Sequence, residues 1–278
     1  MNKIIMIIAS NLRNENDVLR ICKSLDIDNH IIVYFINQSE QINLEDIYAF
    51  TKCHVHEIRT RKIIPLAVAR NLALKEIYSS EWERNEVVMF VDDDAWFPIE
   101  TLKYLLEFDR KALSLHTFDP ITRKSFSLAN KTDGEIKGWH LVRDIVSISI
   151  VIPLDFMLNN KLYFNEKLGL GNEISQGEES LFVYNANKKG LRFYRDTHQI
   201  FHPYKKSFNL KNFYSMAYFW SWGCFHVSYI FAIPMMKYLI KYTIAFGLTV
   251  KDSRYIQVGK NVWKGTIDGC KNTKEINN

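Results

Sequence analysis

Three consecutive aspartates carry the clearest chemical signal in the sequence. Asp92, Asp93 and Asp94 directly follow the apolar run 87–91, which is typical of a buried strand. Adjacent carboxylates repel one another, so a cation or a strong hydrogen-bond network must hold them together. Mg²⁺ and Mn²⁺ are hard cations that such oxygen ligands suit. The triplet therefore predicts a divalent-metal site at a strand end; the alternative is a solvated acidic turn before the helix that begins near Pro98.

A second acidic pair, Glu178 and Glu179, opens a helix that is predicted to run to Lys189. A carboxylate of this kind can act as a general base, because it can take the proton of a reacting hydroxyl group. Ser175 and Glu178 have the spacing of a capping box, in which the glutamate bonds back to the first residue of the helix. Glu179 is then the free acid and the candidate base. The alternative is that both acids only complement the positive end of the helix.

The elements that must position these acids alternate along the first half of the chain. Apolar, β-branched runs predict strands, and segments of helical periodicity lie between them. We expect strands at about 3–9, 31–36, 54–58 and 87–91, and helices at about 15–25, 44–52, 65–78 and 98–108. Such alternation is typical of βαβ units. The predicted fold class is α/β, a Rossmann-like and mostly parallel sheet with helices on both faces.

The middle of the chain is less regular. A strand is predicted at 146–151, and two more near 191–195 and 198–202. The segment 131–140 is interpreted as a loop. Its Trp139 and His140 are a candidate ligand platform, because flat aromatic faces suit ring-shaped ligands such as sugars. The alternative is a tryptophan that is buried in the core.

The composition changes from about residue 207, where aromatic residues become dense and charges sparse. We therefore expect a domain at 1–206 and a helical C-terminal extension at 207–278. The run 218–236 holds no charge apart from His226 and is close to the length that spans a bilayer. Ser221, Gly223 and Pro234 interrupt it. Three alternatives remain for this run: contact with a membrane surface, packing within the protein or a dimer, and a membrane span.

Overall composition excludes several classes. Of the 278 residues 47% are hydrophobic and 24% charged, as in ordinary globular proteins. A net charge of +5 is small for a nucleic-acid-binding protein, so no nucleic-acid partner is expected. The four cysteines form no CxxC pair, which favours a reducing compartment, and the apolar run 4–9 is too short for a signal peptide. We expect a cytoplasmic protein, with the inner face of the membrane as a further possible place.

Residues 3 to 205 resemble the GT-A glycosyltransferases, in particular family 2. The aspartate triplet after a strand resembles the DxD motif of that family. Ala69-Arg70-Asn71 resembles its ARN segment, and Glu178-Glu179 resembles its ED-type motif, whose second acid is the catalytic base. The resemblance implies a GT-A fold and transfer of a sugar, with inversion, from a nucleotide-diphosphate sugar to an acceptor hydroxyl. This sequence has a glutamate where the motif usually ends in aspartate.

The same resemblance implies a role for each site residue. Donor contacts would come from Ala9, Asn11, Asn37, Arg70, Asp92 and Asp93, metal ligation from Asp92, Asp94 and His202, and catalysis from Glu179 with Glu178. A histidine ligand favours Mn²⁺ over Mg²⁺ as the cofactor. Asn37 stands where an aspartate is usual. The segment before Ala69 has Ile64, Pro65 and Leu66 in place of the usual glycine and serine.

A UDP-sugar donor and a glycan or lipid-linked acceptor are the partners that the resemblance implies, in synthesis of a bacterial surface polysaccharide. Peripheral membrane contact or a homodimer through the C-terminal extension is the further expectation. One alternative function is that of a nucleotidyltransferase, although the segment after the first strand, 10–13, lacks the glycine-rich loop that such enzymes carry. The other is a non-catalytic sugar-binding protein on a transferase-like fold.

Overall fold

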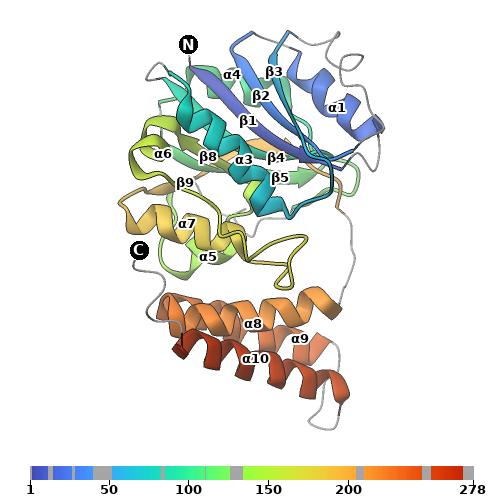
Figure 1. Cartoon of the computed structure of the whole chain (residues 1–278), viewed down its shortest axis with the longest axis vertical. Helices are drawn as coiled ribbons and strands as arrows, with labels where there is room; N and C mark the ends of the chain where they lie inside the picture. Colours follow the sequence, from blue (N-terminus) through green and yellow to red (C-terminus); the bar gives the residue numbers. More distant parts are fainter. Residues whose placement is uncertain are drawn as a thin grey trace.

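A computed structural model of the chain describes residues 2–11, 15–26, 29–39, 52–82, 85–109, 111–125, 134–204, 210–245 and 252–271. A twisted sheet with helices on both faces forms the larger part of the molecule, and three C-terminal helices lie together at one end (Figure 1). The predicted α/β class and the helical C-terminal region are thus confirmed. The helix predicted at 44–52 falls almost entirely outside the described residues.

The first half of the sheet is parallel, as the alternation in the sequence predicts. Its strands are β1 (Lys3–Ser10), β2 (Ile31–Asn37), β3 (His54–Arg59) and β4 (Glu86–Asp92), in the order β3-β2-β1-β4. The helices between and after them are α1 (Glu15–Leu25), α3 (Leu66–Ser79) and α4 (Ile99–Glu107). Ser10 pairs with Asn37, and Ala9 with Asp92. The carboxyl ends of β1, β2 and β4 therefore meet at one edge of the sheet.

The second half of the sheet is mixed. Its elements are β5 (Ala112–Asp119), β6 (Lys124–Ser125), β7 (Gly134–Glu135), α5 (Trp139–Asp144), the 3₁₀ turn η1 (Ser147–Ser149), β8 (Ile150–Pro153), α6 (Leu154–Asn160), α7 (Glu178–Lys188) and β9 (Phe193–Phe201). β8 runs antiparallel between β4 and β5, and β9 lies parallel to β5.

Three details of this half differ from the predictions. The described part of the expected loop 131–140 contains β7 and the first turn of α5. The strand expected at 146–151 begins only after η1 and ends at Pro153. The two strands expected near 191–202 are one strand, β9, because a register shift between Ser114 and His116 of β5 accommodates its polar middle.

Side chains of β1 divide the core into two layers. Ile5 and Ile7 point to the layer that holds α3, α6 and α7, whereas Ile4, Met6 and Ile8 point to the layer that holds α1 and α4. Successive side chains of a strand face opposite sides of the sheet, and both sides are covered here. This is why β1 reads as a continuous apolar run rather than an alternating one. The covered sheet is the rigid support for the polar residues at its edge.

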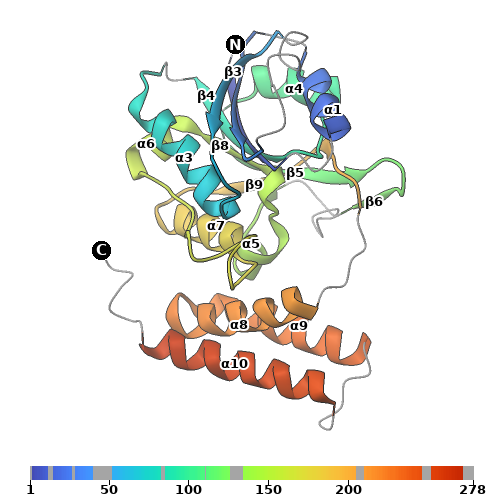
Figure 2. The same ribbon diagram turned by 45° about the vertical axis from the view of Figure 1, so that its right-hand side comes forward.

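Three helices follow the sheet domain: α8 (Leu210–His226), α9 (Ala232–Ala245) and α10 (Ser253–Lys271), with the short turn η2 (Tyr229–Phe231) before α9. They form a layer beside α5 and α7 (Figure 2). Phe219, Trp220 and Phe231 belong to the same buried cluster as α7. Much of the run 218–236 therefore packs inside the protein. None of the described helices has the length and apolar content needed to cross a membrane.

Small residues let α10 lie close to α8. A Cβ atom added at Gly265 would come 2.5 Å from the carbonyl oxygen of Tyr218, and one at Gly269 would come 2.9 Å from that of Trp222. Polar contacts fasten the same interface. The Tyr218 hydroxyl donates to Asp268 at 2.9 Å, and Ser221 Oγ donates to the carbonyl oxygen of Val262 at 2.9 Å. The two glycines thus set the distance between the helices.

Replacing Gly265 by alanine is expected to lower the free energy of unfolding by about 1–3 kcal/mol, because the added methyl group must displace the backbone of α8. Gly259, on the same helix, is the matched control, since nothing lies within 4 Å of its added Cβ. Gly259→Ala should raise the free energy of unfolding by about 0.5–1 kcal/mol. Denaturant titration measures both, and a Gly265→Ala variant as stable as Gly259→Ala would contradict the close packing.

Candidate active site

Each member of the aspartate triplet is held by a different neighbour. Asp92 is the last residue of β4, and the turn that follows carries the other two. Asp93 accepts a short hydrogen bond from Ser10 Oγ at the end of β1. Burial raises the pKa of Asp93 and the bond from Ser10 opposes this, while the neighbouring carboxylates raise it further. The mutual repulsion expected from the sequence is therefore present, and several partners offset it.

Arg70 is the buried cation beneath the triplet. Its side chain is 1% exposed, and Nη2 lies 3.3 Å from Asp92 Oδ1 and 3.2 Å from Ser147 Oγ. The guanidinium lies 5.3 Å from the ring centroid of Phe164. Small residues at Ala67, Ala69 and Ala73 bring α3 close to the sheet, which carries Arg70 below Asp92. Within the described part of the chain, Arg70 Nη1 is buried without a hydrogen-bond partner.

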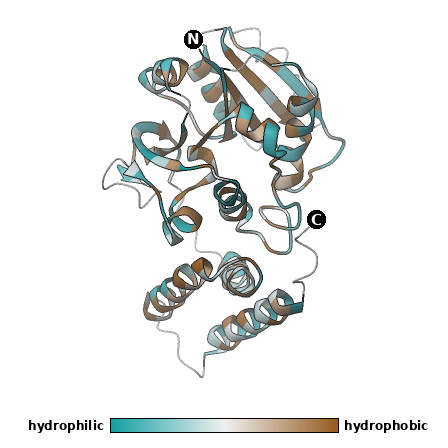
Figure 3. Ribbon diagram, turned by 90° about the vertical axis from the view of Figure 1, so that its left-hand side faces the viewer, coloured by the Kyte–Doolittle hydropathy of each residue, from teal (hydrophilic) through white to brown (hydrophobic). Residues whose placement is uncertain are grey.

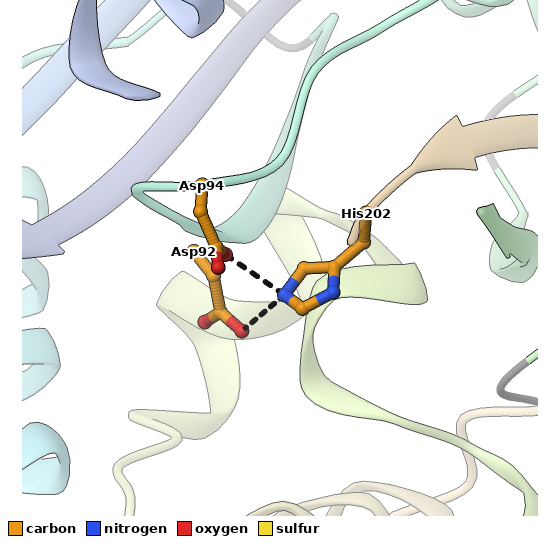
Figure 4. Close-up of side chains that lie close together, drawn as sticks. All are labelled: Asp92, Asp94 and His202. Carbon is orange, nitrogen blue, oxygen red and sulfur yellow. Dashed lines mark ion pairs between the residues drawn. The ribbon is translucent and has the colours of Figure 1, made fainter. Parts of the chain in front are cut away.

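His202 closes the cluster from the other side of the sheet (Figure 4). Its Nε2 lies 2.9 Å from Asp94 Oδ1 and 3.6 Å from Asp92 Oδ2. Its Nδ1 lies 3.0 Å from the carbonyl oxygen of Pro203, and donation to that oxygen leaves Nε2 facing the carboxylates. Burial by itself would lower the pKa of His202, but hydrogen bonds and charge from Asp92 and Asp94 outweigh it and raise the pKa to about 9.

The same three residues have the donor set of a divalent-metal site. One ligand atom from each of Asp92, Asp94 and His202 lies within 4.8 Å of the other two. Two carboxylates and one imidazole suit Mn²⁺ better than Mg²⁺, which prefers oxygen ligands. Without a cation, the protonated imidazole supplies the positive charge between the aspartates. A bound cation would replace that proton, so the residues present fit a metal.

A short β-bridge brings His202 to the triplet. Trp96 and Phe201 exchange two backbone hydrogen bonds, each 2.9 Å long, so the residue after Phe201 comes next to the turn after β4. Arg20 of α1 braces the same turn. Its Nη2 donates to the carbonyl oxygen of Asp94 at 2.9 Å, and its guanidinium lies 4.0 Å from the ring centroid of Trp96. The sequence analysis missed Arg20, which has no motif of its own.

A cavity of about 390 Å³ opens beside the cluster at the carboxyl ends of β1 and β4. Six of the predicted site residues line it, namely Ala9, Asn11, Asp92, Asp93, Asp94 and His202. Seven further lining residues were not predicted as site residues, namely Asp17, Gln38, Ile63, Ile64, Leu66, Leu170 and Gly171. Asn37, Arg70, Glu178 and Glu179 are not among the residues that line it.

Asn37 shapes the turn that follows β2. It is fully buried, donates from Nδ2 to Glu57 Oε1 at 2.8 Å, and accepts at Oδ1 from the amide of Ser39 at 3.0 Å. This local bond is that of an Asx turn. The next residue, Gln38, reaches the cavity and accepts a 2.8 Å bond from the amide of Ile64. The turn thus places Gln38, rather than Asn37, on the cavity wall.

The capping box predicted from Ser175 and Glu178 is wrong. α7 begins after Gly177, which has φ 96°, and no side chain among the described residues caps its first turn. The ring of Phe219 packs on Gly177, where an added Cβ would lie 2.5 Å from it, and only glycine tolerates both the space and the backbone angle. Ser175 Oγ instead bonds Asn212 Oδ1 at 3.0 Å.

Glu178 is a buried acid rather than a cap. Burial first, then the charge of Glu179 and a hydrogen bond with it, raise the pKa of Glu178 well above its ordinary value, while the charge of Arg70 opposes the rise. Its carboxyl group packs on Gly169, where an added Cβ would lie 2.6 Å from Cδ. Glu179 is partly exposed in the same first turn. The pair therefore consists of one enclosed and one accessible carboxyl group.

Trp139 is engaged on both ring faces. The ring of His140 stacks on it at 3.8 Å between centroids, and Lys237 Nζ of α9 lies 4.0 Å from its centroid. Two groups this close to one centroid require opposite faces. The sugar platform expected at Trp139 is therefore not free, and the ring instead links α5 to α9.

Comparison with known proteins identifies the fold. No protein-family model matches the chain, and no curated protein matches it in sequence. Three solved structures of S. aureus TarS match it in three dimensions. TarS 1-349 in complex with UDP-GlcNAc gives a TM-score of 0.65 at 16% identity over 98% of this chain and 90% of that chain. The chain has a GT-A glycosyltransferase fold.

The other two TarS structures agree with the first. TarS 1-349 alone gives a TM-score of 0.62 at 17% identity, over 98% of this chain and 83% of that one. The longer TarS structure gives 0.64 at 17% identity, and this chain covers 50% of it. At such identities the likeness concerns the fold, which includes the GT-A sheet expected from the sequence.

Mn²⁺ added to chelator-treated protein is expected to raise its melting temperature, because the cation binds the folded cluster only. Asp94→Asn removes one charged ligand and should weaken Mn²⁺ binding by about tenfold or more. Asp109→Asn is the control, since this acid is 92% exposed and outside the cluster. Calorimetric titration measures the affinities; an Asp94→Asn variant that binds Mn²⁺ as tightly as the control would exclude the proposed ligands.

Glu178→Gln is expected to make stability less dependent on pH. The folded state raises the pKa of Glu178, so the stabilisation is complete below the unfolded pKa near 4.5 and declines as the pH rises towards the folded pKa. The slope for one proton is about 1.4 kcal/mol per pH unit. Denaturant titrations at pH 5 and pH 8 should show a smaller loss for Glu178→Gln than for Glu173→Gln, whose side chain is 86% exposed. Equal losses would contradict a buried acid.

Proposed function

We propose that the chain is a metal-dependent glycosyltransferase that moves a sugar from a nucleotide-diphosphate sugar to an acceptor hydroxyl group. The observation that carries the proposal is the Asp92, Asp94 and His202 cluster on the wall of a cavity at the carboxyl ends of β1 and β4. Open α/β sheets bind their ligands at this edge. TarS, whose fold the chain shares, was crystallised with UDP-GlcNAc. This supports a UDP-sugar as the donor.

The cavity supplies a place for the donor. Its volume of about 390 Å³ lies within the usual range for small-molecule sites. We assign donor contacts to Ala9, Asn11 and Asp93, which line the cavity. Asn37 contributes indirectly, because it shapes the turn that places Gln38 on the cavity wall. A bound Mn²⁺ or Mg²⁺ would neutralise charge on the departing diphosphate. The chain's own part is to hold the carboxylates in place: Arg70 contacts Asp92, Ser10 contacts Asp93, and Arg20 holds the backbone of the turn.

We assign the general base to Glu179. A base must reach the acceptor hydroxyl group, and Glu179 is the accessible member of the acidic pair. The carboxyl group of Glu178 is buried against Gly169. The charge of Arg70 lowers the pKa of Glu178, but burial outweighs it, and the raised pKa favours the protonated form. A protonated Glu178 donates a hydrogen bond to Glu179 and so positions it. Inversion at the sugar is the stereochemistry that this single-base arrangement supports.

The acceptor is proposed to be a glycan or a lipid-linked glycan of a bacterial surface polysaccharide, and the place of action the cytoplasm at the inner face of the membrane. Residues 1–206 form the proposed catalytic domain, and 207–278 the helical extension. Because Phe219, Trp220 and Phe231 share the core of the sheet domain, the extension helps to hold α7 and its acidic turn. The extension thus packs against α7, the helix whose first turn carries the proposed base Glu179.

Glu179→Gln is expected to abolish sugar transfer, by about 10²–10⁴-fold in turnover, while leaving donor binding intact, because only the proton acceptor is lost. Glu178→Gln keeps the shape of the protonated acid and should retain much more activity. The measurement is release of UDP from a panel of UDP-sugars with Mn²⁺, together with calorimetric donor affinity for each variant. Normal turnover in Glu179→Gln, with loss in Glu178→Gln, would reverse the two roles.

The same assay separates the proposal from its rivals. A nucleotidyltransferase would release pyrophosphate from a nucleoside triphosphate rather than UDP from a UDP-sugar. A non-catalytic sugar-binding protein would bind the donor and leave it unchanged at every enzyme concentration. Metal-dependent release of UDP is expected here, and its absence across the whole donor panel would contradict the proposed transferase.

A further inference from the structure

The positive charge of this chain is concentrated on its C-terminal helices. Residues 210–271 hold eight lysine or arginine residues and two aspartates, a net charge of +6, whereas the whole chain carries +5. The sheet domain is therefore close to neutral. The stretch 210–245, which covers α8 and α9, contains no acidic residue at all. Both aspartates of the region are engaged, Asp252 with Arg254 and Asp268 with Tyr218.

The same helices expose large apolar side chains. Ile233, Met236, Ile240 and Ile244 recur at helical spacing along α9, and all four are exposed. At 100° per residue they fall within one narrow strip of the helix surface. Ile240 is 57% and Ile244 76% exposed, and Tyr229 just before α9 is 81% exposed. We call the four α9 residues the outer apolar strip.

The outer apolar strip lies opposite the face by which α9 packs. Met235, Tyr238 and Leu239 pack on the hydrophobic clusters of the protein, roughly on the other side of the helix. A surface helix normally has a polar outer face, so α9 is unusual in being apolar on both. Lys241, which is exposed, flanks the strip along one side. Lys237 lies on the same side, but its Nζ contacts the ring of Trp139 on α5. Figure 3 shows that hydrophobic residues are frequent along the ribbons of the C-terminal helices.

We propose that the outer apolar strip of α9 docks the protein on a bilayer that carries anionic headgroups. An apolar strip beside an exposed lysine, in a region of net charge +6, is the chemistry of a helix that lies in the membrane interface, with its apolar side chains below the headgroups and its cations among them. A second copy of the chain fits less well, because two surfaces of net charge +6 would repel each other. The helix lies on the bilayer and does not cross it.

The test uses the whole protein and vesicles of phosphatidylglycerol or phosphatidylcholine in a sedimentation assay. Wild-type protein is expected to sediment with the anionic vesicles and less as salt is raised, and to stay in solution with the neutral ones. Changing both Ile240 and Ile244 to glutamate should weaken binding by about tenfold or more, because the strip becomes anionic. Ile121→Glu is the matched control, since Ile121 is 84% exposed but lies in the sheet domain.

The outcomes are distinct from those of the activity assays, since binding to vesicles does not rest on the transferase function. Absence of binding to anionic vesicles would overturn the proposal. Equal binding by the double variant and the Ile121→Glu control, with equal melting temperatures, would overturn the assignment to α9. Light scattering that shows a wild-type oligomer which the double variant loses would identify the strip as an interface between copies, and would also overturn it.

Discussion

Three carboxylates are crowded together at the end of β4, and the positions of the residues around the site depend on this constraint. Negative charges held this close are tolerated only beside a matching set of positive charges and donors. Three residues supply that set: Arg70 from α3, Ser10 from β1 and His202 after β9. Arg20 from α1 holds the backbone of the same turn. The residues that a metal would need are thus held in place by the same contacts that make the fold.

The second half of the chain completes the cluster rather than forming a separate layer. The backbone bridge between Trp96 and Phe201 fixes the end of β9 beside the aspartate turn, and so delivers His202. The positive charge of Arg70 acts on two acids: Arg70 pairs with Asp92, and it also lowers the pKa of Glu178 at the start of α7. One buried cation therefore influences both acidic groups of the proposed reaction. Phe219 of α8 packs on Gly177 and links the C-terminal helices to the same point.

The sequence predicts β1, β2 and β4 well, because each is a short apolar run that is buried on both faces. It also predicts that Asp92, Asp94 and His202 come together in a cluster with the donor set of a metal site, because the aspartates follow a strand and the family resemblance implies a histidine after the last strand. The start of α7 was misread, because the capping-box spacing carries no information about Phe219, which packs on Gly177 from more than forty residues away. Arg20 and Gln38 were missed for the same reason: their roles depend on tertiary contacts rather than on local pattern.

Binding of UDP in the presence and absence of Mn²⁺ tests the central claim, that the cluster holds a metal which meets the donor diphosphate. By calorimetry, the affinity for UDP should rise by about tenfold or more when Mn²⁺ replaces chelator, because cation and diphosphate stabilise each other in the site. Uridine, which lacks the diphosphate, should bind equally in both conditions. Equal affinity for UDP with Mn²⁺ and with chelator would contradict the account.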